Sequence, residues 1–238
     1  MEKFVASDVD DSPVYSKPVA EIAEVNGSAA AERRLSRGSS GKEHIELVVI
    51  ASSTGGPTAL DTVFSQLPAD IKVPILIVQH MPPEFTGVLA QTLCKKYSLD
   101  VKEGSDGDRV EPGRIIIAPG GMHMTVSSSK GFGNEIRLLN TPYVNGVRPS
   151  ADVLFSSVAK EYKGKGVLAV VLTGMGNDGT QGIREMKEEC NCYCITQSES
   201  SCVVYGMPKC VYEAGLSDEV GELKEIAFRM YQIVRGRR

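Results

Sequence analysis

The sequence predicts an α/β fold, in which a doubly wound, mostly parallel sheet is flanked by helices and carries a small β-hairpin insertion. Three observations predict this fold. Apolar, β-branched runs of strand length recur along the chain, helical segments separate them, and short strands between Gly and Ser turns occupy the middle. Alternation of strands and helices favours parallel strands that are covered by helices on both faces.

The first elements form a strand–helix–strand unit. Glu46–Ser52 is predicted to be a buried strand, because its run of apolar residues suits a parallel strand covered on both faces. A Gly-Gly-Pro sequence ends this strand, and Pro57 suits the first turn of a helix that runs to about Gln66. Ile75–Gln79 is the second predicted buried strand.

Further elements follow in order along the chain. A helix is expected over Phe85–Tyr97, with Val88, Leu89 and Leu93 on its apolar stripe. The next predicted elements are three short strands, Arg114–Pro119, His123–Val126 and Ile136–Leu139. We interpret them as a β-hairpin region inserted into the α/β fold. The last predicted elements are a helix over Ser150–Tyr162, a strand over Gly166–Leu172, a helix over Thr180–Glu189, a strand over Tyr193–Thr196, and helices over Lys209–Gly215 and Gly221–Val234.

Composition and charge restrict the class of protein. We expect a flexible tail over residues 1–43 and one catalytic domain over residues 44–238. The net charge of -4 disfavours a nucleic-acid binder, because such proteins are usually basic. The apolar runs are shorter than the ~20 residues of a membrane span, and the N-terminus lacks the apolar core of a signal peptide. We therefore expect a cytoplasmic protein without membrane insertion.

The cysteines are interpreted as buried thiols rather than as metal ligands. Cys190, Cys192 and Cys194 alternate along a predicted strand, whereas zinc sites usually separate paired cysteines by two to four residues. Without a secretion signal, a disulfide framework is disfavoured as well. We predict no metal and no cofactor.

Three chemically reactive side chains follow three of the predicted buried strands. Ser53 comes after the first strand and His80 after the second, and Asp178 lies in the Gly-rich loop after Gly166–Leu172. Active sites of open parallel sheets lie beyond the carboxyl ends of the strands, so we expect the three side chains to meet there. A serine, a histidine and an aspartate are the nucleophile, base and orienting carboxylate that acyl transfer requires.

Each of these residues also has an ordinary structural interpretation. Ser53 could be a helix N-cap, His80 a partly buried histidine, and Asp178 a cap for the helix that begins at Thr180. Taken singly, the structural interpretations of the serine and the histidine are favoured. The position of all three at strand ends favours the catalytic interpretation. His123 is the alternative base, and it could line the cleft or simply pack.

Glycines beside Ser53 indicate where an oxyanion could be stabilised. Gly55 and Gly56 let the backbone approach a bound group, and N–H groups at a helix N-terminus stabilise negative charge. A phosphate site is disfavoured, because the sequence has no GxxxxGK[ST] motif and no GxGxxG after the first strand. The G-x-S-x-G elbow of common esterases is missing too.

Seven segments of the chain resemble the catalytic domain of the chemotaxis protein-glutamate methylesterase family, CheB. They are ASSTGGP, QHMPPEFT, GDRVEPG, IAPGGMHM, VRPSADVLF, LTGMGNDG and SCVVYGMP, in family order over about residues 46–220. The resemblance implies a hydrolase that removes methyl groups, as methanol, from glutamate esters on the cytoplasmic helices of methyl-accepting chemotaxis receptors. Many family members also deamidate receptor glutamines, so the same activity is expected here.

The resemblance also implies roles for individual residues. The family's catalytic serine directly precedes Thr-Gly-Gly, which identifies Ser53 rather than Ser52, and its histidine and aspartate match His80 and Asp178. In this mechanism His80 removes the Ser53 proton and Asp178 orients the imidazole.

Other residues are expected to contact the substrate. By the same resemblance, Thr54, Gly55 and the backbone at Met175 would help to hold the substrate or the oxyanion. His123 could touch the substrate, and Arg148 could bind acidic side chains of a receptor, since arginine suits carboxylates. A surface arginine without a role is an equal alternative.

The chain departs from the family in one respect. Usual members carry an N-terminal receiver domain of ~100 or more residues, which residues 1–43 cannot supply. We therefore expect an ungated enzyme, a stand-alone variant, or one gated by a separate regulatory partner. Two other functions remain open: a hydrolase of the same fold that acts on a different substrate, and an inactive module that binds receptor helices.

Overall fold

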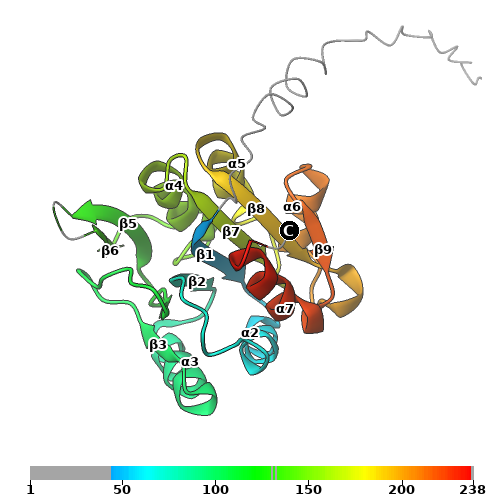
Figure 1. Cartoon of the computed structure of the whole chain (residues 1–238), viewed down its shortest axis with the longest axis horizontal. Helices are drawn as coiled ribbons and strands as arrows, with labels where there is room; N and C mark the ends of the chain where they lie inside the picture. The colour runs from blue at the N-terminus through cyan, green and yellow to red at the C-terminus, as the bar shows by residue number, and fades with distance from the viewer. Residues whose placement is uncertain (1–43, 130, 132, 237–238) are drawn as a thin grey trace, which may run out of the picture. The chain divides into compact units, whose positions relative to one another are not determined.

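The structure is a computed structural model that describes residues 44–129, 131 and 133–236, and the predicted tail over residues 1–43 lies outside the described residues. Its main-sheet strands are β1 (Ile45–Ser52), β2 (Ile75–Gln79), β3 (Asp100–Glu103), β4 (Arg114–Ile117), β7 (Gly166–Val171), β8 (Asn191–Gln197) and β9 (Glu219–Gly221). Within the described residues these strands form one parallel sheet in the order β3-β4-β2-β1-β7-β8-β9 (Figure 1). The predicted α/β fold is confirmed.

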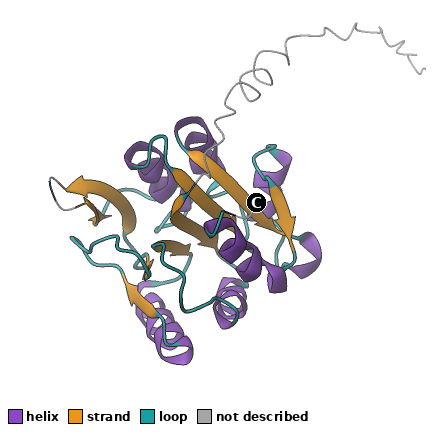
Figure 2. Ribbon diagram, in the orientation of Figure 1, coloured by secondary structure: helices purple, strands orange, loops and turns teal. Residues whose placement is uncertain are grey.

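Helices cover both faces of this sheet (Figure 2). One layer contains α2 (Gly56–Ser65), α3 (Pro83–Tyr97) and α7 (Leu223–Val234), and the other contains α4 (Ala151–Glu161), α5 (Thr180–Glu189) and α6 (Met207–Glu213). A single 3₁₀ turn follows β8 at Glu199–Ser201. None of the described helices is long and apolar enough for a membrane span.

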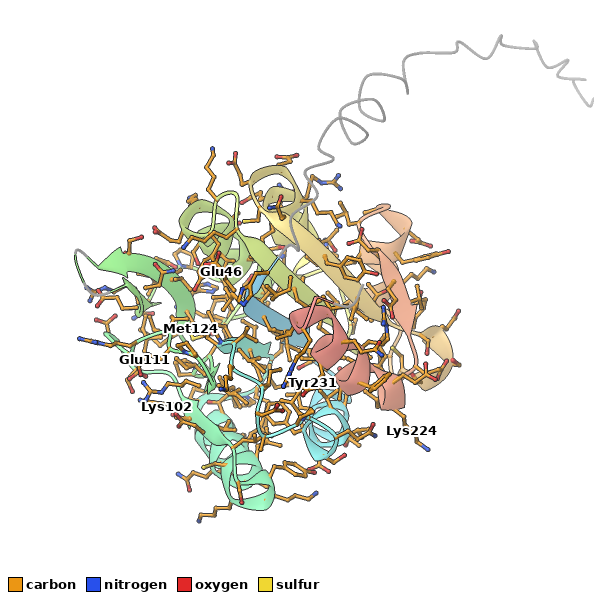
Figure 3. All side chains as sticks on the ribbon, in the orientation of Figure 1. Glu46, Lys102, Glu111, Met124, Lys224 and Tyr231 are labelled. Carbon is orange, nitrogen blue, oxygen red and sulfur yellow. The ribbon has the colours of Figure 1, made fainter. Side chains whose placement is uncertain are left out.

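The alternation of side chains along β1 explains why both helical layers form. Val48 and Ile50 pack in the layer of α2, α3 and α7, whereas Val49 and Ala51 pack in the opposite layer. Successive strand residues face opposite sides, so a strand covered on both faces needs apolar residues at every position. On the solvent side of α7, Lys224 extends away from the sheet (Figure 3).

The hairpin insertion is smaller than the sequence pattern predicts. It consists of β5 (His123–Ser129) and β6 (Gly133–Leu139), which pair antiparallel outside the main sheet and pack on α4. The prediction that Arg114–Pro119 belongs to this insertion is wrong, because β4 pairs in parallel with β2 and β3. The isoleucines of β4 are buried in both layers, which is the environment of a parallel-sheet strand.

The apolar stripe of α3 also differs from the prediction. Val88 is 59% exposed, whereas Thr86, Ala90 and Leu93 are buried. Thr86 can occupy an inward position because its hydroxyl donates to Glu103 Oε1 at 2.5 Å and accepts from the Gly120 N–H at 3.0 Å. Leu93 is buried and Leu89 packs against the same core, as predicted, so the predicted stripe is wrong at Val88.

Helices α4 and α5 approach each other closely at Gly182. A Cβ atom at this position would lie 2.4 Å from Phe155 Cβ and 3.2 Å from main-chain atoms of Asp152. Phe155 is fully buried, and the Gly182 N–H donates to Asp152 Oδ1 at 2.8 Å. Glycine therefore permits a contact that fixes the first turn of α4 against α5.

We expect Gly182→Ala to lower the free energy of unfolding by about 2 kcal/mol, because overpacking outweighs the higher helix propensity of alanine. Denaturant unfolding measures this change. The matched control is Gly87→Ala in α3, where the added Cβ would meet only the side chain of Glu103, at 3.2 Å. The control should change stability by less than about 1 kcal/mol. Equal losses in the two variants would contradict the close-packing explanation.

Candidate active site

The order of the strands brings the three predicted catalytic residues to neighbouring positions. Ser53 directly follows β1, His80 directly follows β2, and Asp178 lies in the loop after β7. Because β1 lies between β2 and β7, the serine is central. The His80 N–H donates to Ser52 O and the Ser53 N–H donates to Thr173 O, each at 3.0 Å. The three strand ends are therefore joined by main-chain hydrogen bonds.

His80 and Asp178 are in direct contact. The distance between His80 Nε2 and Asp178 Oδ2 is 2.8 Å, and the two side chains are 9% and 3% exposed. An ionised aspartate accepts the Nε2 proton, so Nδ1 is the ring nitrogen left to act as a base. Within the described residues, no hydrogen bond joins the Ser53 hydroxyl to the imidazole. The structure thus places an imidazole–carboxylate pair at the strand ends beside Ser53.

Asp178 is held at the N-terminus of α4. Its Oδ1 accepts hydrogen bonds from Ser150 Oγ at 2.6 Å and from the Asp152 N–H at 3.2 Å, and its Oδ2 accepts one from the Ala151 N–H at 2.5 Å. Burial raises the pKa of Asp178, but hydrogen bonds from His80, Ser150 and Ala151 outweigh it and bring the pKa below the usual value. The carboxylate therefore stays charged, although it is buried.

Asn145 connects Asp178 to a second carboxylate. Its Nδ2 lies 3.0 Å from Asp178 Oδ1 and 2.6 Å from Asp152 Oδ2. Asn145 and Gly146 have φ values of 53° and 75°, and Val144 and Val147 exchange backbone hydrogen bonds across them. These features define a two-residue type I′ turn, which Asn-Gly favours. The turn therefore directs the Asn145 amide at both carboxylates.

Asp152 differs from Asp178 in the direction of its pKa shift. Burial raises the pKa of Asp152 and is the largest effect, and the nearby charge of Asp178 adds to it, while hydrogen bonds from Gly182 and Asn145 act against it. The net result is a pKa above the usual value for aspartate. Two carboxylates in one network thus shift in opposite directions.

His123 supports the site from inside the protein. Its side chain is 0% exposed, Nε2 lies 3.0 Å from Pro142 O, and Nδ1 accepts the Ser150 N–H at 3.1 Å. Both nitrogens are therefore engaged, and the ring has no surface for a substrate. The structure does not place His123 where it could contact a substrate or replace His80 as the base.

Ser53 is not the helix cap that its structural interpretation predicts. Gly55, with φ of 79°, is the N-cap of α2, and no side chain caps this helix. Within the described residues, the main-chain N–H groups of Thr54, Gly55 and Met175 donate to no main-chain or side-chain acceptor. Unpaired N–H groups beside a serine are the kind of donor that an oxyanion requires.

A groove of about 780 Å³ begins at His80. Its walls include Met81, Pro82, Tyr143 and Arg148. Arg148 Nη1 donates to Asn140 Oδ1 and Thr141 O, each at 2.8 Å, and its guanidinium lies 4.7 Å from the centre of the Tyr143 ring. Arg148 therefore borders the groove, and its Nη1 group is engaged by its own loop.

Cys190 and Cys194 are buried thiols as predicted, whereas the other four cysteines are partly exposed. Burial raises the pKa of the Cys190 thiol to about 11, and burial raises that of Cys194 well above its usual value. Thiols that resist deprotonation are poor nucleophiles and poor metal ligands. The described part of the chain contains no group of three or more side chains that could hold a metal ion.

Sequence reasoning missed three residues of the site. Ser150 and Asn145 bind Asp178, and Gln79 donates to the main-chain oxygens of Ser53 and His80. Two signals could have indicated Asn145 and Ser150. An Asn-Gly pair flanked by valines predicts a tight turn, and a serine at the start of a predicted helix is a typical N-cap.

Comparisons with known proteins identify similar sequences. A family model described as CheB methylesterase matches residues 48–230. A Desulfotalea psychrophila protein named protein-glutamate methylesterase/protein-glutamine glutaminase is 49% identical over 195 residues, which are 82% of this chain and 53% of that protein. A Desulfitobacterium hafniense protein of the same name is 46% identical over 199 residues, which are 82% of this chain and 50% of that protein. The chain spans about half the length of these curated relatives.

A solved structure has the same fold. The crystal structure of the Thermotoga maritima CheB methylesterase catalytic domain matches with a TM-score of 0.76 at 40% sequence identity. The match covers 80% of this chain and 99% of the Thermotoga maritima chain. The predicted resemblance is therefore confirmed for the sheet and its helices.

The charge of Asp178 should make stability depend on pH. Because its pKa is lowered on folding, the carboxylate stabilises the fold above its unfolded pKa of about 4, and this contribution is lost as the pH falls through the folded pKa. We expect Asp178→Asn to be less stable than the wild type at about pH 7, with a difference that shrinks below about pH 4. Denaturant unfolding across this range measures the difference.

Asp152→Asn is a control of opposite sign. Because the pKa of Asp152 is raised, the stability of the wild type relative to this variant should fall as the pH rises from about 4 to 7. A difference between the wild type and Asp178→Asn that stays constant down to about pH 2 would show that the Asp178 charge does not stabilise the fold.

Proposed function

Because the chain belongs to the CheB methylesterase family, we propose that it hydrolyses methyl esters of glutamate side chains in a protein substrate and releases methanol. Ser53 is the proposed nucleophile, His80 the general base, and Asp178 the carboxylate that orients the imidazole. The observation that carries this proposal is the 2.8 Å contact between His80 Nε2 and Asp178 Oδ2 beside the end of β1.

The choice of Ser53 rather than Ser52 as the nucleophile is supported by burial. Ser52 is 0% exposed, and its hydroxyl donates to Gln79 Oε1 at 2.6 Å. Ser53 lies at the turn into α2 and is partly exposed. A nucleophile must reach the ester carbonyl, which a buried hydroxyl that is already engaged cannot do.

In the first half of the proposed reaction, His80 Nδ1 accepts the Ser53 proton as Ser53 Oγ attacks the ester carbonyl. Asp178 stabilises the imidazolium that forms. The N–H groups of Thr54, Gly55 and Met175 are the proposed donors to the oxyanion, since they are not engaged within the described residues. Collapse of the tetrahedral intermediate transfers the proton to the leaving methoxide, and methanol departs.

In the second half, water attacks the acyl-enzyme. His80 now accepts a proton from the water, and the oxyanion is stabilised by the same donors. Breakdown of the second intermediate returns the proton to Ser53 and leaves a glutamate carboxylate on the substrate. The sum is ester plus water to carboxylate, methanol and a proton. The same steps with an amide would release ammonia, so we also propose glutamine deamidation, which the names of the relatives include.

The proposed substrates are methyl-accepting chemotaxis receptors, and the proposed place of action is the cytoplasm, where their methylated helices lie. Exposed apolar side chains around the site support a protein substrate. Tyr143 is 63% exposed beside the groove, and Met175 is 76% exposed in the loop before Asp178. Large apolar side chains that are exposed beside a site can contact a protein substrate.

We expect the wild type to release methanol from a methylated cytoplasmic fragment of a chemotaxis receptor. Ser53→Ala should lower kcat at least ~1,000-fold, because removal of a triad nucleophile abolishes the covalent route. The measurement is methanol release under saturating substrate.

Ser52→Ala is the matched control, since it removes the adjacent hydroxyl. This variant should keep at least about a tenth of the activity, because Ser52 contacts Gln79 and not the substrate. Similar losses in both variants would contradict the assignment of the nucleophile. If the wild type hydrolysed another ester but no receptor ester, the proposed substrate would be wrong and the proposed hydrolysis would stand.

A further inference from the structure

The carboxamide of Gln79 joins the backbone of Ser53 to the backbone of His80. Gln79 is 1% exposed at the end of β2, and its Nε2 donates to Ser53 O and to His80 O, each at 3.0 Å. The two acceptors belong to different segments, because Ser53 continues into α2 and His80 continues toward α3. A single amide group therefore bridges the segments that carry the proposed nucleophile and base.

This bridge lies where the ordinary strand pairing ends. The register of β1 and β2 ends at Ser52 opposite Gln79, and one further main-chain bond runs from the His80 N–H to Ser52 O. Beyond this point the two chains diverge. The Nε2 bonds of Gln79 thus replace the ladder at the place where the reactive side chains begin.

The orientation of the amide is fixed by its partners. Carbonyl oxygens only accept hydrogen bonds, so the NH₂ group must face Ser53 O and His80 O. The Ser52 hydroxyl donates to Oε1 at 2.6 Å on the other side of the amide. All three contacts agree on one orientation of the amide.

The start of α2 leaves room for the carboxamide. A Cβ atom on Gly56 would lie 1.9 Å from Gln79 Oε1 and 2.8 Å from Gln79 Cδ. Glycine at this position lets the helix begin directly beside the buried amide. The backbone of α2 and the Gln79 side chain are therefore fitted to each other.

We propose that Gln79 is a positioning residue for the hydrolysis: its carboxamide holds the Ser53 and His80 backbones at the separation that proton transfer between their side chains requires. This inference rests on the proposed function, in which Ser53 and His80 are the nucleophile and the base. Misplacement of reacting groups by about 1 Å can cost about 100-fold in rate. Loss of the bridge is thus a loss of catalytic rate rather than of substrate binding.

The test uses the full chain with Gln79→Met, which keeps the length of the side chain but removes its donors. Thr196→Val is the matched control, because Thr196 is 0% exposed on β8 and its hydroxyl lies 2.8 Å from Ser217 Oγ. Both variants lose buried hydrogen bonds, but the control leaves the Ser53 and His80 backbones untouched. Four quantities are measured: the melting temperature, the rate at which a fluorophosphonate probe labels Ser53, and kcat and KM for methanol release.

The expected result separates positioning from stability. Gln79→Met should lower both the labelling rate and kcat by about 100-fold with KM changed less than about threefold. Thr196→Val should stay within about threefold of the wild type in labelling rate, kcat and KM. The proposal would be overturned if the labelling rate and kcat of Gln79→Met lay within threefold of those of Thr196→Val.

Two further variants keep the test decisive if Gln79→Met does not fold. Gln79→Glu keeps the shape of the side chain but places an oxygen, instead of the NH₂ group, against the carbonyl oxygens of Ser53 and His80. The probe should therefore label this variant at least as slowly as we expect for Gln79→Met. Ser52→Ala frees Oε1 and should slow labelling by about two- to tenfold. Labelling by both at the wild-type rate would overturn the proposal.

The probe also separates failure of the proposed function from failure of this inference. A wild type that is labelled at Ser53 but releases no methanol overturns the substrate, and the labelling rates of the variants still decide the role of Gln79. A wild type that is not labelled at Ser53 overturns the assignment of the nucleophile and the positioning role together.

Discussion

The buried negative charge of Asp178 is the constraint on which the site depends. A carboxylate without partners in the interior would take up a proton, and a neutral acid could not stabilise an imidazolium. Its donors come from three separate segments: His80 after β2, the first turn of α4 with Ser150, and Asn145 in its tight turn. Each segment is thereby tied to the same carboxylate, and the close packing of α4 on α5 at Gly182 fixes the helix that supplies most of the donors.

A layer of buried polar side chains separates the apolar core from this chemistry. Ser52 and Gln79 lie at the ends of β1 and β2, and Thr173 and Gln197 lie at the corresponding ends of β7 and β8. Gln197 Oε1 accepts the Thr173 N–H at 2.7 Å, and the Thr173 hydroxyl donates to Thr54 O at 2.9 Å. These side chains thus supplement the main-chain hydrogen bonds between the loops, because regular pairing ends where the strands diverge toward their helices.

Whether a feature of the fold or of the site can be predicted from the sequence depends on how far apart in the chain the interacting residues lie. The buried strands and the strand-end positions of Ser53, His80 and Asp178 follow from local apolar patterns. The edge strand β3 does not, because it has polar residues and its partner β4 comes from a separate segment. The contact of His123 with Ser150 was also beyond local patterns, since the residues are joined only by the folded chain. The roles of Asn145 and Gln79 depend on where their amides point, which composition does not encode.

The Asn-Gly turn has a consequence for the chemical lifetime of the protein. Asparagine is thermolabile, and a following glycine offers little steric hindrance to attack of its nitrogen on the side-chain carbonyl and loss of ammonia. At Asn145 this reaction would give a cyclic imide, and its hydrolysis by water would put a third carboxylate beside Asp152 and Asp178 in place of the amide donor. Repulsion among the three charges would weaken the contact that Asp178 makes with His80, so ageing of a single turn would disrupt this site in an otherwise intact fold.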